Sequence, residues 1–197
     1  MNYTYGIYLY QGVASLDFVG PYEAFDLSRY LLNSGKVVTI AERMDPIVCA
    51  NGMKVLPQYT FETAPKLDVV LVPGANELEA ALSSPRAIDW IASVSEDVKF
   101  MTAVCTGSLI LQKAGLLKGK KATTHWMLVD ELKKDADTNV LADMRYVRDG
   151  HIVTSQGVSA GIDMALWLLG QLHEPDHARQ VRKLLQYDPA PPYMAEV

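Results

Sequence analysis

The chain has 197 residues, of which 49% are hydrophobic, and carries a formal net charge of −5 at pH 7. This length and composition suit one core of ordinary size, so we expect a single domain over residues 1–197. The negative charge, with no Lys/Arg cluster interleaved with aromatic residues, argues against nucleic acid as a partner.

Membrane, metal and disulfide chemistry are also disfavoured. The two cysteines are far apart, which gives neither a disulfide framework nor metal-ligand spacing, and the four histidines show no such spacing either. No uninterrupted apolar run approaches the roughly 20 residues of a membrane span. Residues 1–5 lack the basic and apolar regions of a signal peptide. We therefore expect a cytoplasmic protein without metal, cofactor or membrane partner.

Predicted strands and helices alternate along the first half of the chain. We expect strands at residues 5–10, 36–41 and 67–72, helices at 20–32, 77–82 and 85–95, and a small hairpin at 47–56. Gly20-Pro21 is expected to open the first helix, and Asn51-Gly52 the turn of the hairpin. The unbroken Val/Leu content of the strand at 67–72 indicates burial on both faces.

The same alternation continues in the second half. We expect strands at residues 100–104 and 119–124 and helices at 109–114, from 125 onward and at 175–187, and the segment 155–163 is expected to lead into a helix that reaches about residue 172. A hairpin is expected at 144–154 around Asp149-Gly150. A proline-rich, extended tail is expected over residues 188–197. Strands alternating with helices predict an α/β fold, a mostly parallel sheet with helices on both faces.

A single cysteine lies at the elbow between the strand at 100–104 and the helix after it. The positive end of a following helix favours the thiolate form, so the Cys105 context indicates a nucleophile. Free cysteines are more often small buried hydrophobes, but a strand-to-helix elbow flanked by Thr106 and Gly107 reverses that preference. Cys49 has no such context.

Two other segments are expected at the same edge of the sheet. Asp17 follows the first strand, and ligands of open parallel sheets bind beyond the carboxyl ends of the strands, so Asp17 and Cys105 can converge. A helix cap is the alternative role for Asp17. Pro73-Gly74 ends the third main strand and offers backbone N–H groups as oxyanion donors, although Pro-Gly is also a common plain turn.

Several motifs in chain order resemble one family. They are Leu16-Asp17-x-x-Gly20-Pro21, Val72-Pro73-Gly74, Val104-Cys105-Thr106-Gly107-Ser108, Ala122-Thr123-Thr124-His125-Trp126, Val147-Arg148-Asp149-Gly150, Ala160-Gly161-Ile162-Asp163 and Tyr187-x-Pro189-Ala190-Pro191-Pro192. Together they resemble the ThiJ/PfpI superfamily, a class I glutamine-amidotransferase-like group, and within it the isonitrile hydratases most. The resemblance implies a flavodoxin-like three-layer sandwich, a homodimer and a small-molecule substrate.

The resemblance also implies a reaction, the addition of water to R–N≡C to give an N-substituted formamide. Cys105 would attack the terminal carbon to form a thioimidate, and Asp17 would deliver the proton or steer the water. Thr106 would contribute a hydroxyl or a backbone donor. The substrate and the oxyanion would be held by Gly74, Ala75, Gly157 and Val158.

The chain departs from the family pattern at three positions. Protease-like members carry histidine where this chain has Thr106, so peptidase activity is disfavoured. Ala75 stands where the hydratase pattern has a second glycine, and Gln156 stands in a loop expected to be rich in glycine. The last two changes bear on the identity of the substrate.

Two reserve candidates and two other functions stay open. Glu23 is a second carboxylate that could point at the cysteine, and His125 is either a catalytic base or, by preference, a structural hydrogen-bonding residue. Parts of the sequence also resemble the amino-terminal part of AraC-type regulators, which suggests a ligand or oxidative-stress sensor. Their basic helix-turn-helix region is not found here. Glyoxalase or deglycase-like chemistry would use the same thiolate.

Overall fold

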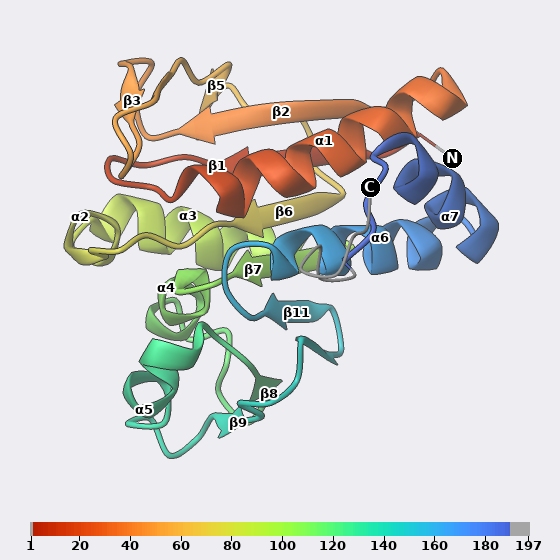
Figure 1. Ribbon diagram of the computed structural model, residues 1–197. Coiled ribbons are helices and arrows are strands. Elements are labelled where there is room, and N and C mark those ends of the chain that lie inside the picture. The colour runs from red at the N-terminus through yellow and green to blue at the C-terminus, as the bar shows by residue number, and fades with distance from the viewer. Residues whose placement is uncertain (1, 190–197) are drawn as a thin grey trace.

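A seven-stranded sheet forms the centre of the protein, seen in a computed structural model that describes residues 2–189 (Figure 1). Its strand order is β10-β11-β7-β6-β1-β2-β5. The strands are β1 (Thr4–Tyr8), β2 (Lys36–Ala41), β5 (Tyr59–Thr60), β6 (Val69–Val72), β7 (Phe100–Val104), β10 (Tyr146–Asp149) and β11 (Ile152–Ser155). All neighbours pair in parallel except β10 and β11. This confirms the predicted mostly parallel sheet.

Helices cover both faces of this sheet. They are α1 (Ser15–Leu32), α2 (Glu79–Leu82), α3 (Pro85–Ser95), α4 (Gly107–Lys113), α5 (Val129–Leu132), α6 (Ala160–Leu172) and α7 (Pro175–Leu184). Helices α1, α6 and α7 pack against one another on one face, and α3 and α4 lie on the other (Figure 1). Because every residue of β6 and β7 is buried between these layers, their continuous apolar sequence is explained. No helix among residues 2–189 is long and apolar enough to cross a membrane.

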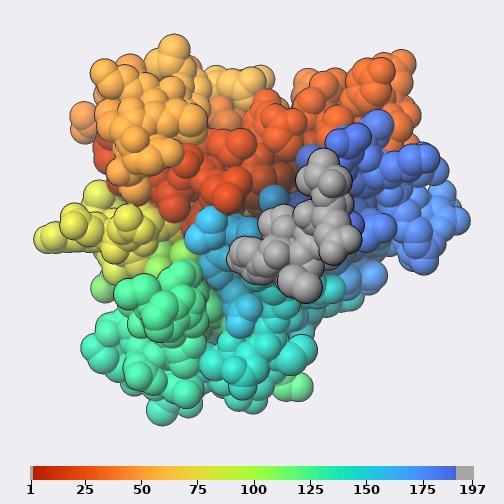
Figure 2. Space-filling view, in the orientation of Figure 1, coloured from red at the N-terminus to blue at the C-terminus, as the bar shows by residue number. Residues whose placement is uncertain are grey.

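Two small sheets lie outside the central one. Strands β3 (Ile47–Val48) and β4 (Lys54–Val55) form the antiparallel hairpin predicted around Asn51-Gly52. Strand β8 (Lys121–Ala122) pairs in parallel with β9 (Asn139–Val140), a strand that the sequence did not predict. In Figure 2 the hairpin region forms the light orange upper left of the visible face, and the segment around β8 and β9 belongs to the green and teal lower part.

The first helix begins earlier than the sequence predicts. We expected Gly20-Pro21 to open it, but α1 begins at Ser15 and Pro21 lies inside it. Proline has no N–H, so Pro21 leaves the carbonyl of Asp17 without its helical donor. The packing of α1 against α6 and α7 outweighs this loss. Asp17 therefore lies in the first turn of α1 rather than before the helix.

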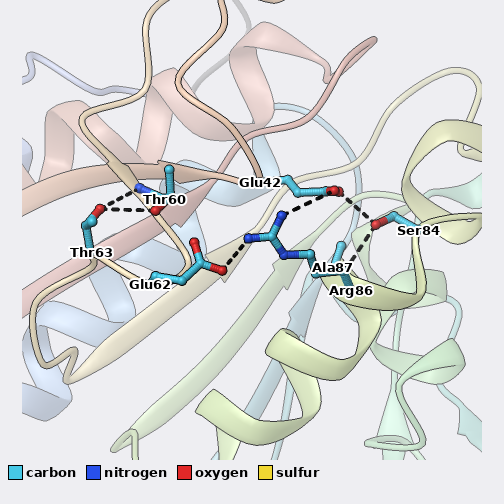
Figure 3. A network of polar contacts seen from close by, with 7 residues as sticks. All are labelled: Glu42, Thr60, Glu62, Thr63, Ser84, Arg86 and Ala87. Atoms are coloured by element: carbon cyan, nitrogen blue, oxygen red, sulfur yellow. Dashed lines mark hydrogen bonds and ion pairs between the residues drawn. The ribbon is translucent and has the colours of Figure 1, made fainter.

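A polar network joins the carboxyl end of β2 to the start of α3 (Figure 3). The Ser84 hydroxyl accepts the Ala87 N–H as the helix cap and donates to Glu42 Oε2 at 2.8 Å. Arg86 pairs with both Glu42 and Glu62. A carboxylate beside a helix N-terminus is also favoured by the helix dipole. The network fixes α3 relative to the sheet edge where the candidate site lies.

Candidate active site

Cys105 occupies the predicted elbow between β7 and α4. Its φ is +59°, a left-handed conformation that side chains other than glycine rarely adopt. Its N–H donates to the Gln156 carbonyl at 3.2 Å, and its own carbonyl accepts from the hydroxyls of Thr124 at 3.0 Å and Ser108 at 3.1 Å. The side chain is buried, with 7% of the residue exposed. Cys105 therefore has a left-handed backbone between β7 and α4, and hydrogen bonds to Gln156, Thr124 and Ser108 hold it from three directions.

Asp17 converges with Cys105, as the sequence predicts. Upstream of α1, Val13 pairs with Ala75, and the Ala14 N–H donates to the Gly74 carbonyl at 2.8 Å. This contact brings the first turn of α1 against the turn after β6, where the Gly74 N–H donates to Asp17 Oδ2 at 3.0 Å. Asp17 is fully buried, and its Oδ1 has no hydrogen-bond partner of normal geometry within residues 2–189. One carboxylate oxygen is thus anchored and the other is available.

Burial shapes the protonation of both groups. Burial raises the pKa of Asp17 to about 6. Hydrogen bonds from the Gly74 N–H, the Cys105 thiol and the Val158 N–H act in the opposite direction but are outweighed. The pKa of Cys105 rises to about 12, first through burial and then through the negative charge of Asp17, although the N–H groups of Thr106 and Val158 oppose the change. At neutral pH the resting pair is therefore a thiol beside a largely ionised carboxylate.

This pairing corrects one sequence-based expectation. We expected the helix N-terminus to favour the Cys105 thiolate, and the N–H groups near the sulfur do act in that direction. The desolvation of a buried thiol and the adjacent carboxylate outweigh them. The thiol form of Cys105 therefore prevails in the resting protein, with the Asp17 carboxylate beside it.

The predicted donors at the end of β6 are already engaged. The Gly74 N–H is used by Asp17, and the Ala75 N–H donates to Thr106 Oγ1 at 2.9 Å. The Thr106 hydroxyl in turn donates to the Ala75 carbonyl at 2.8 Å. A Cβ at position 74 would lie 3.0 Å from Asp17 Oδ2 and only 2.6 Å from the Thr106 nitrogen, so only glycine fits. These hydrogen bonds hold Asp17 and the turn after β6 in place, and the Thr106 hydroxyl bonds both the N–H and the carbonyl of Ala75.

The turn between β11 and α6 supplies a different donor. Val158 has a φ of +53°, which is strained for a β-branched residue, and its N–H acts on both Cys105 and Asp17. Strain of this kind persists where surrounding structure imposes it, typically at functional sites. Gly157 precedes it, and a Cβ there would overlap the His125 ring. Val158 therefore lies beside Cys105 and Asp17, and Gly157 lies beside His125.

The remaining candidates lie in different places. His125 caps the short 3₁₀ helix η1 (Trp126–Leu128), its Nδ1 accepting the Met127 N–H at 3.3 Å. This is the structural role preferred from the sequence. Glu23 is exposed on α1, and the carboxylate brought to the cysteine is Asp17. The Gln156 side chain donates to the Ala142 carbonyl at 2.9 Å and so is held by a neighbouring loop.

Tyr10 is a site residue that sequence reasoning missed. It is buried, and its hydroxyl donates to the Pro73 carbonyl at 2.9 Å, next to the turn that holds Asp17. Burial, with Tyr8, Asp17 and Cys105 nearby, raises its pKa well above the ordinary value. The sequence did carry a signal for Tyr10, because it lies just after β1 at the same edge of the sheet where Asp17 was expected.

A cavity of about 520 Å³ adjoins the site on the side of α2 and α4. Ala75 and Thr106 form its inner wall, and Leu82, Leu109 and Leu128 give it an apolar lining. The neighbourhood of the elbow therefore offers space for an apolar group.

Within residues 2–189 no group of three His, Cys, Asp or Glu side chains is arranged to hold a metal ion.

Comparisons with known proteins find relatives of this chain. The chain is 38% identical over 188 residues to an isonitrile hydratase of Pseudomonas putida, covering 95% of this chain and 80% of that protein. It is 32% identical over 136 residues to the HTH-type transcriptional regulator CdhR of Pseudomonas aeruginosa, covering 69% of this chain and 40% of the regulator.

Solved structures share the whole fold. A ThiJ/PfpI family protein from Pseudomonas syringae superposes with a TM-score of 0.90 at 34% identity, covering 100% of this chain and 80% of that one. Drosophila melanogaster DJ-1beta, at 23% identity, superposes with a TM-score of 0.82 over 95% of this chain and all of that one, which supports the fold alone. The DJ-1/PfpI family model matches residues 6–171, and the chain therefore belongs to the DJ-1/PfpI family.

Proposed function

We propose that the protein is a hydratase that converts isonitriles to N-substituted formamides. The observation that carries the proposal is the buried pair of Cys105 thiol and Asp17 carboxylate, held at an elbow with an unpartnered Asp17 Oδ1. Similarity over nearly the whole chain to a protein named isonitrile hydratase supports the choice of substrate. The apolar cavity beside Thr106 suits the organic group of such a substrate.

In the first step the sulfur bonds to the terminal carbon of R–N≡C. Asp17 accepts the thiol proton as the sulfur attacks and then returns it to the same carbon. The product is a thioimidate, R–N=CH–S, bound to Cys105, and Asp17 is again ionised. The N–H groups of Thr106 and Val158 stabilise the thiolate while it exists.

In the second step water hydrolyses the thioimidate. Asp17 takes a proton from the attacking water and passes it to the nitrogen, which gives a tetrahedral R–NH–CH(OH)–S intermediate. The hydroxyl proton is transferred through the carboxylate to the leaving sulfur as the C–S bond breaks. R–NH–CHO is released and the thiol is restored, so the sum of both steps is the addition of one water.

Mass spectrometry of the intact protein with cyclohexyl isonitrile, together with detection of the formamide, tests this proposal. The wild type should form product, Asp17→Asn should form little, and Cys105→Ala should form none above the uncatalysed rate. Full turnover by Cys105→Ala would refute the mechanism. A stable adduct of the wild type without turnover would refute hydration but leave the thiol as a nucleophile.

The similarity to CdhR supports a second candidate, a ligand sensor. It extends over 69% of this chain but only 40% of the regulator. A sensor would bind small electrophiles at the same elbow without releasing product. Assaying methylglyoxal for conversion to lactate in the same experiment tests glyoxalase-like chemistry, which would also depend on Cys105.

We further propose a homodimer located in the cytoplasm. Exposed apolar side chains flank the site, including Leu16 next to Asp17 and Trp126 next to His125, and a second copy of the chain would cover such surface. Light scattering during size-exclusion chromatography should give twice the chain mass. The mass of a single chain would reject the dimer.

A further inference from the structure

The motif Thr123-Thr124-His125 has no part in the proposed chemistry, yet it contacts one strained residue of the site and the neighbour of the other. Thr124 is fully buried, and its hydroxyl donates to the Cys105 carbonyl at 3.0 Å across 19 positions of sequence. The next residue, His125, has its ring against Gly157, which directly precedes Val158. A single short segment thus contacts Cys105, which has a positive φ, and the residue before Val158, which has a positive φ as well.

This segment is itself anchored to the sheet. The Thr123 N–H donates to Thr154 Oγ1 on β11 at 2.8 Å, in a fully buried position. By contrast, the Thr123 hydroxyl is buried and has no hydrogen-bond partner within residues 2–189. The hydroxyls of these two equally buried threonines therefore differ, because only that of Thr124 makes a hydrogen bond, and it makes it to the elbow.

The backbone of Cys105 is left-handed, and the hydrogen bond from the Thr124 hydroxyl to its carbonyl helps to hold that conformation. A left-handed conformation is sterically unfavourable for a residue other than glycine and persists only where neighbouring groups impose it. The Ser108 hydroxyl comes from the turn of the elbow itself, three residues away. Thr124 is the donor from a distant part of the chain, so it ties the elbow to the rest of the fold.

We propose that Thr124 is a positioning residue, whose hydroxyl holds the Cys105 carbonyl so that the sulfur stays against Asp17. The inference rests on the proposed role of the thiol but not on the identity of the substrate. Loss of the hydroxyl lets the elbow relax, and the sulfur then moves away from the carboxylate. Proton transfer within the pair becomes slower, while the cavity for the substrate is unchanged.

Thr124→Val and Thr123→Val form a matched pair of variants, with Thr124→Ser as the rescue. The first readout is the rate of iodoacetamide alkylation at the Cys105 peptide as a function of pH. Thr124→Val should move the midpoint of this profile to lower pH, because the thiol leaves the negative charge of Asp17. Thr123→Val and Thr124→Ser should keep the wild-type midpoint.

The second readout is formamide production. Thr124→Val should lower kcat about ten-fold, the kinetic equivalent of one lost hydrogen bond, with KM changed less than two-fold. Equal midpoints and kcat values for Thr124→Val and Thr123→Val would overturn the proposal. Failure of Thr124→Ser to rescue would overturn it too, since packing of the methyl group would then be the cause.

Two controls keep the test decisive. Ser108→Ala removes the other hydroxyl on the Cys105 carbonyl and should shift the alkylation midpoint in the same direction, even if Thr124→Val folds poorly. An unchanged midpoint in Ser108→Ala, with Thr124→Val unfolded, would count against the proposal. If the wild type makes no formamide, the alkylation profiles still test the positioning role separately from the proposed function.

Discussion

At the scale of single residues, the site is a pair of acids that share one negative charge. Burial raises the pKa of both Asp17 and Cys105, and the negative charge of Asp17 raises that of Cys105 further, whereas the Cys105 thiol lowers the pKa of Asp17 by hydrogen bonding. Because Asp17 has by far the lower pKa, the charge lies on the carboxylate in the resting protein. The thiol therefore stays protonated at neutral pH, and in the proposed mechanism it becomes reactive when its proton moves to Asp17.

Asp17→Asn should separate thiol reactivity from turnover. Removal of the negative charge lowers the pKa of Cys105, so alkylation by iodoacetamide at pH 7 should become faster than in the wild type. Formamide production should nevertheless fall by about 10²-fold or more, because no base remains to move the proton. Measuring both rates on one protein preparation checks the prediction.

Parallel changes in the two rates would contradict this account. If alkylation and turnover both fell, Asp17 would be needed for the fold of the site rather than for proton transfer. Glu23→Gln is the matched control, since this carboxylate lies on the exposed surface of the same helix and both rates should stay at the wild-type values.

His125 should support turnover by packing its ring against Gly157 and not by transferring a proton. His125→Phe keeps a ring against Gly157 but loses the nitrogen that caps η1, and turnover should stay within about three-fold of the wild type. His125→Asn keeps a capping acceptor but loses the ring, and turnover should fall about ten-fold. A loss of 10²-fold or more in His125→Phe would instead identify a general base.

Sequence reasoning predicted that Cys105 and Asp17 lie close together but not which donors surround them. Cys105 and Asp17 could be predicted because both follow buried strands that end at one sheet edge. Which backbone N–H faces the sulfur depends on local φ angles, and a left-handed valine such as Val158 has no sequence signature. Likewise, the contact from Thr124 to Cys105 joins segments whose proximity only the folded chain reveals.

At the scale of elements, prediction succeeded where hydrophobic patterns were long. The buried runs of β6 and β7 and the two hairpins were recognisable from apolar runs and Asn-Gly or Asp-Gly turns. Strands β8 and β9 have two residues each, too few to show a period, so β9 was missed. The start of α1 was wrong because packing of the whole helix outweighs the local effect of Pro21.

The turn between β11 and α6 offers a test of stored strain. Val158→Gly removes the steric cost of a left-handed valine, and little buried surface is lost because the side chain is 41% exposed. The free energy of unfolding should rise by about 1 kcal/mol, after allowance for the greater chain entropy of glycine. Turnover should fall several-fold, because the N–H beside Cys105 is held less firmly. Urea unfolding and formamide assays check the two effects.

Val158→Ala is the matched control for this variant. Alanine removes the same exposed methyl groups but keeps a Cβ, and so keeps most of the strain at a φ of +53°. Its stability should therefore not rise. Equal stabilisation by alanine and glycine would show that the valine side chain, rather than its backbone conformation, was unfavourable.

At the scale of the whole molecule, the fold gathers groups from distant parts of the chain at one sheet edge. The first turn of α1 contributes Asp17, and the segments after β6, β7 and β11 contribute Gly74, Cys105 and Val158. Strands β1 and β6 are neighbours at the point where the strand order reverses. Ligand sites of open α/β sheets lie at such points. The rigid layers around the sheet hold an uncompensated carboxylate oxygen and two strained residues that no isolated segment could maintain.

This arrangement should make the stability of the protein depend on pH through Asp17. Burial raises the pKa of this carboxyl from its ordinary value of 3.8 to about 6 in the folded chain, so the folded state binds the proton more tightly than the unfolded state does. The stabilisation is fully present below about pH 3.8 and is lost as the pH rises through about 6. The loss amounts to roughly 3 kcal/mol.

Asp17→Asn has no carboxyl group to titrate at this position. The unfolding free energy of the variant minus that of the wild type should therefore increase between pH 4 and pH 6 and stay constant from there to pH 7. His173 and His177, whose pKa values burial lowers, titrate in both proteins, and their contribution cancels in the difference. Urea unfolding of the two proteins at pH 4, 5, 6 and 7 measures this difference. A constant difference across the series would show that Asp17 is not desolvated in the folded state, and the proton relay to Cys105 would then lose its physical basis.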